Sequence, residues 1–534
     1  MHREGAHVVE MPYLRPRDTL ACLLKEDPWL LLGGMNPGPD TNVMLQTFWG
    51  AYKLSHPSHQ VFVMAEQNQV DLSWTIPVML HGDGARTVKK QPLEVVSLVS
   101  VLGLDTAKDL TCTCPNKFCY SKDASIRDPM LLKLNNSYNS HLHHFLIFCF
   151  PSKKYKGTPG LLKAMLRKVS EEIAECCVEG VSVPGYPKPW HIAVIGLRGD
   201  AEWHSKTGVL NRSYQNVGHK NEIPCCHLCL AGSPNIPFES FRSDAAWKHT
   251  LGHSAPWHAL PPYEPIPFEA DWTCGAAANF FRYDPFHVFR LGIARNFVAS
   301  SIIMFCNFGY YDSPGDDASV VGRLERAWAS FSLWCEAHGK HPASIRSFSK
   351  EKMHYATTSS FPFVGCKGSD TVLLLSYLKF FSGLQIANGN ASEEVRLVKQ
   401  ACEHGLNFGG IHRHGLFLVP MCRDYLYQCV KGFCHAYSRL ASQAFNHQMT
   451  LFGLVPKAHA LAHIYFDLER AWRDTYAINP GVFDTSAYED FVGRIGRMSR
   501  RVSYRHVIRN TLLSYKIKTK FVISRFKKAK HMGL

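Results

Sequence analysis

Three acidic residues stand where a carboxylate can do chemistry. Asp83 lies between two glycines after an apolar run at residues 74–80, and Asp200 follows a glycine after an apolar run at residues 190–196. Glycine lets the backbone turn tightly, which leaves each carboxylate at a strand end, where α/β proteins collect their sites. Glu489 opens a helix-like pattern near the C-terminus. The alternatives are ordinary turn aspartates and, for Glu489, a partner for the helix dipole.

Two cysteines, Cys226 and Cys229, have the Cys-x-x-Cys spacing that lets two thiolates reach one zinc ion. One pair is half of a tetrahedral site, and the sequence leaves the other half open. The candidates for it are His219, Cys225, His227, His253, His258 and Cys274. The alternative is a pair of buried free thiols. A weaker cluster is expected to be structural: Cys112, Cys114 and Cys119.

Histidines recur at one-turn spacings. Asp284 and His287 are one helical turn apart and can face one another, the alternative being a capping aspartate beside a hydrogen-bonded histidine. His459 and His463 share one helix face, just after Lys457. Such a pair can bind a metal ion or a phosphate, or can be two surface histidines. It lacks the glutamate of a metalloprotease helix.

Positive charge is concentrated at the C-terminal end. The formal net charge is +15, and residues 494–534 contain thirteen Lys and Arg and no Asp or Glu. Such a block attracts a polyanion, most simply nucleic acid, with anionic lipid as the rival. Its apolar spacing predicts a folded basic helix. Five arginines are candidates for phosphate contacts, or else a solvated helix face: Arg494, Arg497, Arg500, Arg501 and Arg505.

Size and composition predict a globular, intracellular protein. A chain of 534 residues, 46% of them hydrophobic, can form about two to four domains. Its eighteen cysteines are scattered, and residues 1–18 lack the apolar core of a secretory signal. The longest apolar run, residues 371–381, is too short to cross a bilayer. We therefore expect a reducing compartment, with thiols free or metal-bound.

The elements that must position these residues follow in a definite order. Apolar runs at residues 74–80, 94–102 and 142–150 predict three strands. A helical pattern at residues 160–177 and a fourth strand at 190–196 come next. A mainly helical region follows to about residue 450, with helical periodicity in four segments: 324–334, 371–386, 392–405 and 425–445.

Taken in order, these features resemble the DDE transposases, which have an RNase H-like fold. The likeness is closest to the CACTA (En/Spm) type and related insertion-bearing cut-and-paste families, and it covers about residues 73–507. It rests on the three acids, the Cys-x-x-Cys pair, the Asp-x-x-His element and the Lys457/His459 element. No N-terminal zinc finger or helix-turn-helix for reading transposon ends is recognisable.

The resemblance implies an α/β fold in which an RNase H-like mixed sheet core is interrupted by a zinc-knuckle segment and a large, mainly α-helical insertion. A basic helical C-terminus follows. The implied segments are 1–70, of unclear structure; 71–215, the first part of the core; 216–280, rich in Cys and His; 281–455, the insertion; 456–510, the last part of the core; and 511–534, the basic tail.

The resemblance also implies a mechanism. Asp83 would bridge two Mg²⁺ or Mn²⁺ ions roughly 3.5–4 Å apart, with Asp200 and Glu489, or its neighbour Asp490, holding one each. Transposon ends would be cleaved and joined to target DNA by a homo-oligomer in the nucleus, with a Zn²⁺ ion bound and no membrane partner. The alternatives are an inactive, domesticated transposase that holds DNA, an RNase H-like nuclease for RNA or branched DNA, and an unrelated zinc-stabilised scaffold.

Overall fold

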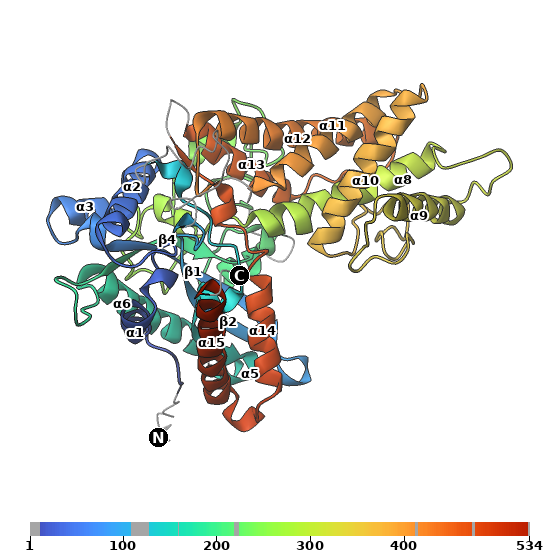
Figure 1. The fold of residues 1–534 in the computed structure, drawn as a ribbon. Helices are drawn as coiled ribbons and strands as arrows, with labels where there is room; N and C mark the ends of the chain where they lie inside the picture. The colour runs from blue at the N-terminus through green and yellow to red at the C-terminus, as the bar shows by residue number, and fades with distance from the viewer. Residues whose placement is uncertain are drawn as a thin grey trace, which may run out of the picture. The chain divides into compact units, whose positions relative to one another are not determined.

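The computed structural model describes residues 11–107, 128–158, 160–217, 224–411, 415–471 and 476–531 of a mixed α/β protein (Figure 1). The chain forms two compact units. Unit 1 comprises Met1–Asn211, Ser254–Arg282 and Thr485–Leu534, and unit 2 comprises Arg212–His253 and Tyr283–Asp484. Unit 2 is therefore an insertion into unit 1. The expected segments 216–280 and 456–510 are each divided between the two units.

A four-stranded sheet with the order β3-β2-β1-β4 is the centre of unit 1. The strands are β1 (Thr75–Arg86), β2 (Pro92–Ser100), β3 (His144–Pro151) and β4 (His191–Arg198). β2 is antiparallel to both β1 and β3, whereas β4 is parallel to β1. The return from β3 to β4 includes α5 (Ser152–Lys156) and α6 (Leu161–Val178). Three strands, a helix and a fourth strand follow one another as expected.

The N-terminal segment, which gives no clear element in the sequence, contains three helices. These are α1 (Pro16–Glu26), α2 (Pro39–Ser55) and α3 (Gln60–Glu66). Trp49 of α2 is fully buried, and its Nε1 donates to the Thr75 carbonyl oxygen of β1 at 2.8 Å. These helices are thus part of the core of unit 1.

Two later segments complete unit 1. Residues 254–282 are joined to it through buried Glu269, which lies 3.0 Å from Arg282 and 3.6 Å from His56. At the C-terminal end, α14 (Glu489–Arg500) packs on β1, and α15 (Val507–His531) packs on β3. The Tyr515 hydroxyl of α15 donates to the His144 carbonyl oxygen at 2.9 Å. The expected basic helix is therefore formed.

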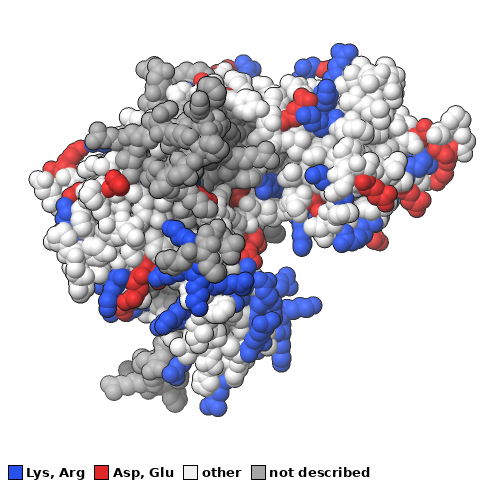
Figure 2. Space-filling view, in the orientation of Figure 1, with Lys and Arg blue, Asp and Glu red and all other residues white. Residues whose placement is uncertain are grey.

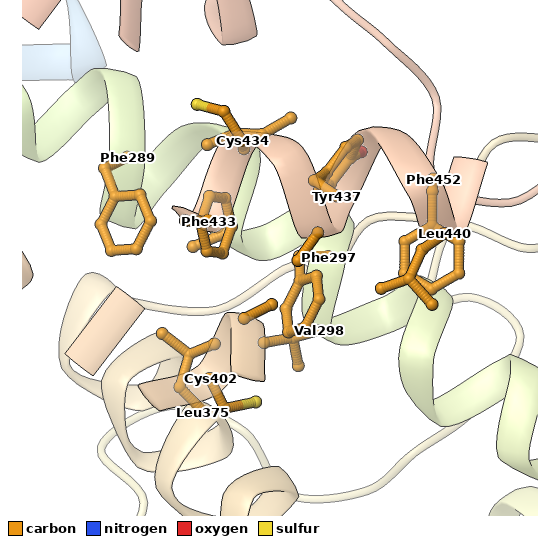
Figure 3. Packing of buried hydrophobic residues seen from close by; sticks show 14 of the residues in the cluster. Phe289, Phe297, Val298, Leu375, Cys402, Phe433, Cys434, Tyr437, Leu440 and Phe452 are labelled. Atoms are coloured by element: carbon orange, nitrogen blue, oxygen red, sulfur yellow. The ribbon is translucent and has the colours of Figure 1, made fainter. Parts of the chain in front are cut away.

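Unit 2 is mainly helical. Its helices are α8 (Ala294–Asn307), α9 (Val320–Ala337), α10 (Gly368–Ala387), α11 (Glu393–Phe408), α12 (Pro420–Asn446) and α13 (Pro456–Arg470). Two short strands, β5 (Phe417–Leu418) and β6 (Ala477–Ile478), pair in an antiparallel ladder. Aromatic residues from several of these elements interlock in one core, for example Phe289, Phe297, Phe433 and Phe452 (Figure 3).

One stretch of unit 2, Phe286–Asn307, is long and apolar enough to cross a membrane by length and composition alone, among the described residues. It consists of a π-helical segment, Phe286–Ile293, followed by α8. Inside the protein 78% of its apolar window is buried. Packing in the core of unit 2 accounts for its apolar composition.

Candidate metal centre and acidic edge

Two cysteines and two histidines from distant parts of the chain converge in unit 2. Cys226 and Cys229 belong to an irregular segment, whereas His459 and His463 lie one turn apart on α13. One ligand atom of each residue lies within 4.8 Å of the other three. All four side chains are buried, with exposed fractions of 0%, 1%, 1% and 2%. The structure thus joins the predicted half-site to a histidine pair that the sequence presents separately.

The four ligand atoms are spaced as in a closed metal site. The Nε2 atoms of His459 and His463 are 3.0 Å apart, and the Sγ atom of Cys229 is 3.2 Å from His459 Nε2. Cys226 Sγ is 3.3 Å from His463 Nε2. In a tetrahedral zinc site with bonds of about 2.0–2.3 Å, ligand atoms are roughly 3.3–3.8 Å apart. This cluster can therefore bind a zinc ion.

Neighbouring groups hold the four ligands in place. The Leu228 backbone N–H donates to Cys226 Sγ at 3.3 Å, and the Tyr283 hydroxyl lies 3.2 Å from the same sulfur. The ring of Trp247 packs against both imidazoles, with centroid distances of 4.8 and 4.7 Å. Such supporting contacts orient ligands and exclude water from a metal site.

Burial and hydrogen bonding shift the pKa values of the cluster's ligands in different directions. Burial lowers the pKa of His459, so its imidazole is neutral near pH 7. Burial raises the pKa of the Cys229 thiol well above its ordinary value. Burial acts the same way on Cys226, but hydrogen bonds with Cys229 and the two histidines outweigh it and hold the pKa of Cys226 well below its ordinary value. Hydrogen bonding thus favours the thiolate of Cys226, the form that coordinates zinc, whereas burial favours the thiol of Cys229.

Several expectations about this region need correction. His459 and His463 are not surface histidines and do not face a phosphate, because both are buried against the two sulfur atoms. The described candidates for the remaining ligands lie outside the four-residue cluster: Cys225, His227, His253, His258 and Cys274. Four further residues fall outside the described part of the chain: His219, Cys112, Cys114 and Cys119.

Asp284 and His287 face one another. His287 Nδ1 lies 2.5 Å from Asp284 Oδ2, while Asp284 Oδ1 accepts from the Phe286 backbone N–H at 2.8 Å. The aspartate is thus both a partner of the histidine and a cap of the π-helical segment. Lys457 of α13 packs across this segment, because a Cβ added to Gly292 would lie 3.0 Å from its side chain. Asp284, His287 and Lys457 all belong to unit 2. Asp284 directly follows Tyr283, whose hydroxyl contacts Cys226.

In unit 1, Asp83 and Asp200 belong to neighbouring parallel strands. Asp200 follows the end of β4 as expected, but Asp83 lies within β1 and pairs with Val95 of β2, because β1 continues to Arg86. His81 of β1 pairs in register with Arg198 of β4, and each acid follows two residues later. A Cβ added to Gly199 would lie 2.8 Å from the Gly82 carbonyl oxygen. The two backbone segments are therefore in close contact directly before Asp83 and Asp200. Both acids also have local roles. Asp83 Oδ1 accepts from the Gly84 N–H at 2.6 Å, and Asp200 Oδ1 caps α7 (Ala201–Thr207) by accepting from the Trp203 N–H at 2.7 Å.

Glu489 begins α14 over the same edge of the sheet. The ring of Tyr488, the preceding residue, lies 4.4 Å from the Arg198 guanidinium and 5.5 Å from the His81 ring. Further along α14, a Cβ added to Gly496 would lie 3.2 Å from Ala85 Cβ. Alternate residues of a strand share a face, so Asp83 lies on the face of β1 that α14 covers, between these two contacts. We call Asp83, Asp200 and Glu489 the acidic edge. Among the described residues, the Cys/His cluster is a group of close metal-ligating atoms, and these three acids do not form another.

Asp490 and the arginines of α14 contact one another. Asp490 accepts from Arg494 Nε at 2.5 Å and from Ser140 Oγ at 3.0 Å, and lies 3.8 Å from Arg497. Burial alone would raise the pKa of Asp490, but these donors outweigh it and hold the pKa below its ordinary value. Arg500 donates to the Arg86 carbonyl oxygen at 2.7 Å. Among the predicted phosphate contacts, Arg494 is of intermediate burial and the other four are exposed: Arg497, Arg500, Arg501 and Arg505.

No protein-family model matches this chain, and no curated protein matches it significantly.

Proposed function

We propose that the protein is a transposase-like polynucleotidyl transferase that cleaves DNA strands and transfers them at the acidic edge. The observation that supports the proposal is the close approach of Gly82 and Gly199, the residues that directly precede Asp83 and Asp200 on neighbouring parallel strands. The start of α14 over these strands supports Glu489 as the third acid. Asp490 is the weaker candidate, since it is already paired with Arg494.

The sheet supports an RNase H-like core. Its chain order is three antiparallel strands, a helix, and a fourth strand parallel to the first. Asp83 lies in the first strand and Asp200 comes just after the fourth. Glu489 begins a late helix, α14, which packs on the first strand. This is the arrangement that the resemblance to DDE transposases implies. The mainly helical unit 2, inserted before Glu489, corresponds to the insertion-bearing families.

Three carboxylates form a donor set for a hard cation such as Mg²⁺ or Mn²⁺. Asp83 and Asp200 would hold such an ion from neighbouring strands, and Glu489 would hold it from the start of α14. When bound, divalent ions would activate an oxygen nucleophile and neutralise phosphate charge.

The surrounding residues orient the edge and hold the DNA. Arg198 is buried and stacks on Tyr488, so it fixes the start of α14 relative to β4. Exposed arginines on and after α14 contact phosphates of the duplex, which positions DNA without reading its sequence. A homo-oligomer in the nucleus follows from this activity as a further part of the proposal.

We propose that the Cys226, Cys229, His459 and His463 cluster binds Zn²⁺ as a structural site. Four protein ligands leave no open coordination position for a substrate. The ion would join the segment around residue 226 to α13. Through the contact of Tyr283 with Cys226, it would also hold Asp284 and His287 in their present positions.

Nicking of supercoiled plasmid DNA in Mn²⁺ tests the proposed activity without knowledge of the transposon ends. We expect wild-type protein to nick the plasmid and Asp83→Asn, Asp200→Asn and Glu489→Gln to lose at least about 100-fold in rate, as expected when charge stabilisation of the transition state is removed. Asp490→Asn is the matched control and should keep most of the activity. Wild-type rates in the Asp83 or Asp200 variants would refute the assignment.

A second candidate is an inactive protein that holds DNA. The local hydrogen bond of Asp83 with the Gly84 N–H and the role of Asp200 as a helix cap favour it, since they account for both acids without chemistry. It predicts that DNA binding is unchanged by Mn²⁺ and that no variant alters plasmid nicking. The plasmid experiment therefore separates the two functions.

A further inference from the structure

The solvent-facing side of α15 carries an apolar stripe. Leu513, Ile517 and Phe521 are 48%, 73% and 57% exposed and recur at every fourth position, so they lie in one row along the helix. The opposite side of α15 is buried against unit 1 through Leu512, Tyr515 and other residues. The row is therefore not needed to hold the helix on the sheet. We call Leu513, Ile517 and Phe521 the α15 stripe.

Basic side chains border the α15 stripe on both sides. At 3.6 residues per turn, Lys516 and Lys520 lie along one side, and Lys518 and Arg525 along the other. The Nζ atom of Lys518 is 5.1 Å from the centroid of the Phe521 ring. The helix contains no Asp or Glu. Figure 2 shows Lys and Arg side chains gathered over the C-terminal helices, with uncharged side chains between them.

This combination discriminates between partners. A nucleic-acid backbone complements the lysines but offers no apolar surface to Leu513, Ile517 and Phe521, which would stay in contact with water and phosphate. A second copy of α15 would bring like charges together, which opposes association. A helix with apolar residues every three or four positions, bordered by Asp and Glu, complements both features at once.

We propose that the outer face of α15 is a docking surface for an acidic amphipathic helix of a partner protein. The three apolar side chains anchor the helix by burial, and the flanking Lys and Arg set its orientation and speed its association. The surface is formed by α15 alone and does not depend on the chemistry of the acidic edge.

A designed peptide is a direct probe. One labelled 20-residue helical peptide places Leu at every third or fourth position between Glu residues, and a second peptide has the same composition in permuted order. Fluorescence anisotropy with the full-length, zinc-replete protein at physiological salt should show at least tenfold tighter binding of the amphipathic peptide. The double variant Ile517→Ser/Phe521→Ser should remove this preference.

Two further variants sharpen the result. Leu333→Ser, at a 69% exposed site on α9, is the matched control and should keep the full preference. Lys516→Glu/Lys520→Glu should weaken the amphipathic peptide at least tenfold while leaving the melting temperature unchanged. Because every substituted side chain is solvent-facing, each variant is expected to fold, and its melting curve verifies this.

Three outcomes would overturn the proposal. The first is equal binding of the two peptides, which would indicate unspecific charge attraction. The second is a preference that survives Ile517→Ser/Phe521→Ser. The third is stripe-dependent sedimentation with phosphatidylcholine–phosphatidylserine vesicles without peptide selectivity, which would assign the surface to lipid.

Discussion

At the residue scale, the cluster of Cys226, Cys229, His459 and His463 shows how two weak patterns combine into one candidate metal site. Cys229 and His459 are 230 positions apart in the chain, yet their ligand atoms are 3.2 Å apart. The Cys-x-x-Cys pair and the His-x-x-x-His pair each have the spacing of half a metal site. Neither pair alone is a complete site, whereas together they supply four buried side chains that can hold one metal ion.

Removing one ligand should release the ion and loosen unit 2. We predict that Cys229→Ser and His463→Ala each lose about one bound zinc per chain, because three ligands in a buried site bind far more weakly than four. Metal content by mass spectrometry and the melting temperature measure the two effects. Cys225→Ser, at a buried cysteine outside the cluster, should keep its zinc. Zinc retained in both variants would refute the assignment of Cys229 and His463 as zinc ligands.

Only part of this site is predictable from the sequence. The spacings that suit each pair are local and can be read directly. The pairing of Cys226 with α13 depends on how the helices of unit 2 pack, so histidines nearer in sequence, such as His227 and His253, compete equally as candidates. The supporting residues Tyr283 and Trp247 carry no signal beyond their aromatic character.

At the element scale, the layer between β3 and the C-terminal helices contains several buried histidines. Burial lowers the pKa of His141 to about 4 and the pKa of His143 to about 3, from an ordinary value of 6.5. The ring of His143 also packs 6.1 Å from the ring of Tyr488, directly before Glu489. Protonation in this layer therefore acts on the helix that begins with the third acid.

This layer should make unit 1 sensitive to mild acid. Between pH 6.5 and about 4 the unfolded chain protonates these imidazoles and the folded chain does not, so the free energy of unfolding falls as the pH falls. We predict that His143→Phe reduces this loss by about 2 kcal/mol at pH 5, at about 1.4 kcal/mol per pKa unit. Nδ1 of His143 has no hydrogen-bond partner among the residues that the structure describes, so the substitution removes none there.

Urea denaturation at pH 7 and pH 5 measures the effect. The exposed His258 of unit 1 supplies the control, since His258→Gln should leave the pH dependence unchanged. An unaltered pH dependence in His143→Phe would show that the acid sensitivity arises elsewhere.

Strands and long helices are the elements that the sequence predicts well. The buried strands β2, β3 and β4 have continuous apolar runs, and α9–α12 have clear helical periodicity. The helices of residues 16–66 are less visible, since proline occupies the first turn of both α1 and α2 and reads as a loop signal. Their place in the core becomes evident only through contacts such as that of Trp49 with β1.

At the scale of the whole molecule, the exposed arginines that follow α14 should make a large contribution to DNA affinity. We predict that Arg501→Gln/Arg505→Gln weakens binding to any duplex and lowers the slope of log affinity against log salt by about one for each phosphate that the variant no longer neutralises. Anisotropy with a random-sequence duplex across a salt series measures it. Arg242→Gln, at an exposed arginine of unit 2 paired with Asp244, should leave the slope unchanged. An unchanged slope in the double variant would exclude these arginines from the interface.

The chain topology explains why the acidic edge needs the whole molecule. Asp83 and Asp200 belong to the first part of unit 1. Glu489 belongs to its last part, which follows unit 2 in the sequence. The sequence predicts the three acids from their local contexts. Their common edge depends on the parallel pairing of β1 with β4 and on the packing of α14, neither of which has a local signature.

Calorimetric titration of zinc-replete protein with Mn²⁺, comparing wild type with Asp200→Asn, tests the central claim most directly. Asparagine keeps the helix cap of α7 but removes the charge, so the fold is maintained while the proposed ligand is lost. The account predicts Mn²⁺ binding in wild type and at least tenfold weaker binding in the variant. Equal binding in both proteins would contradict it, because Asp200 would then not be a ligand.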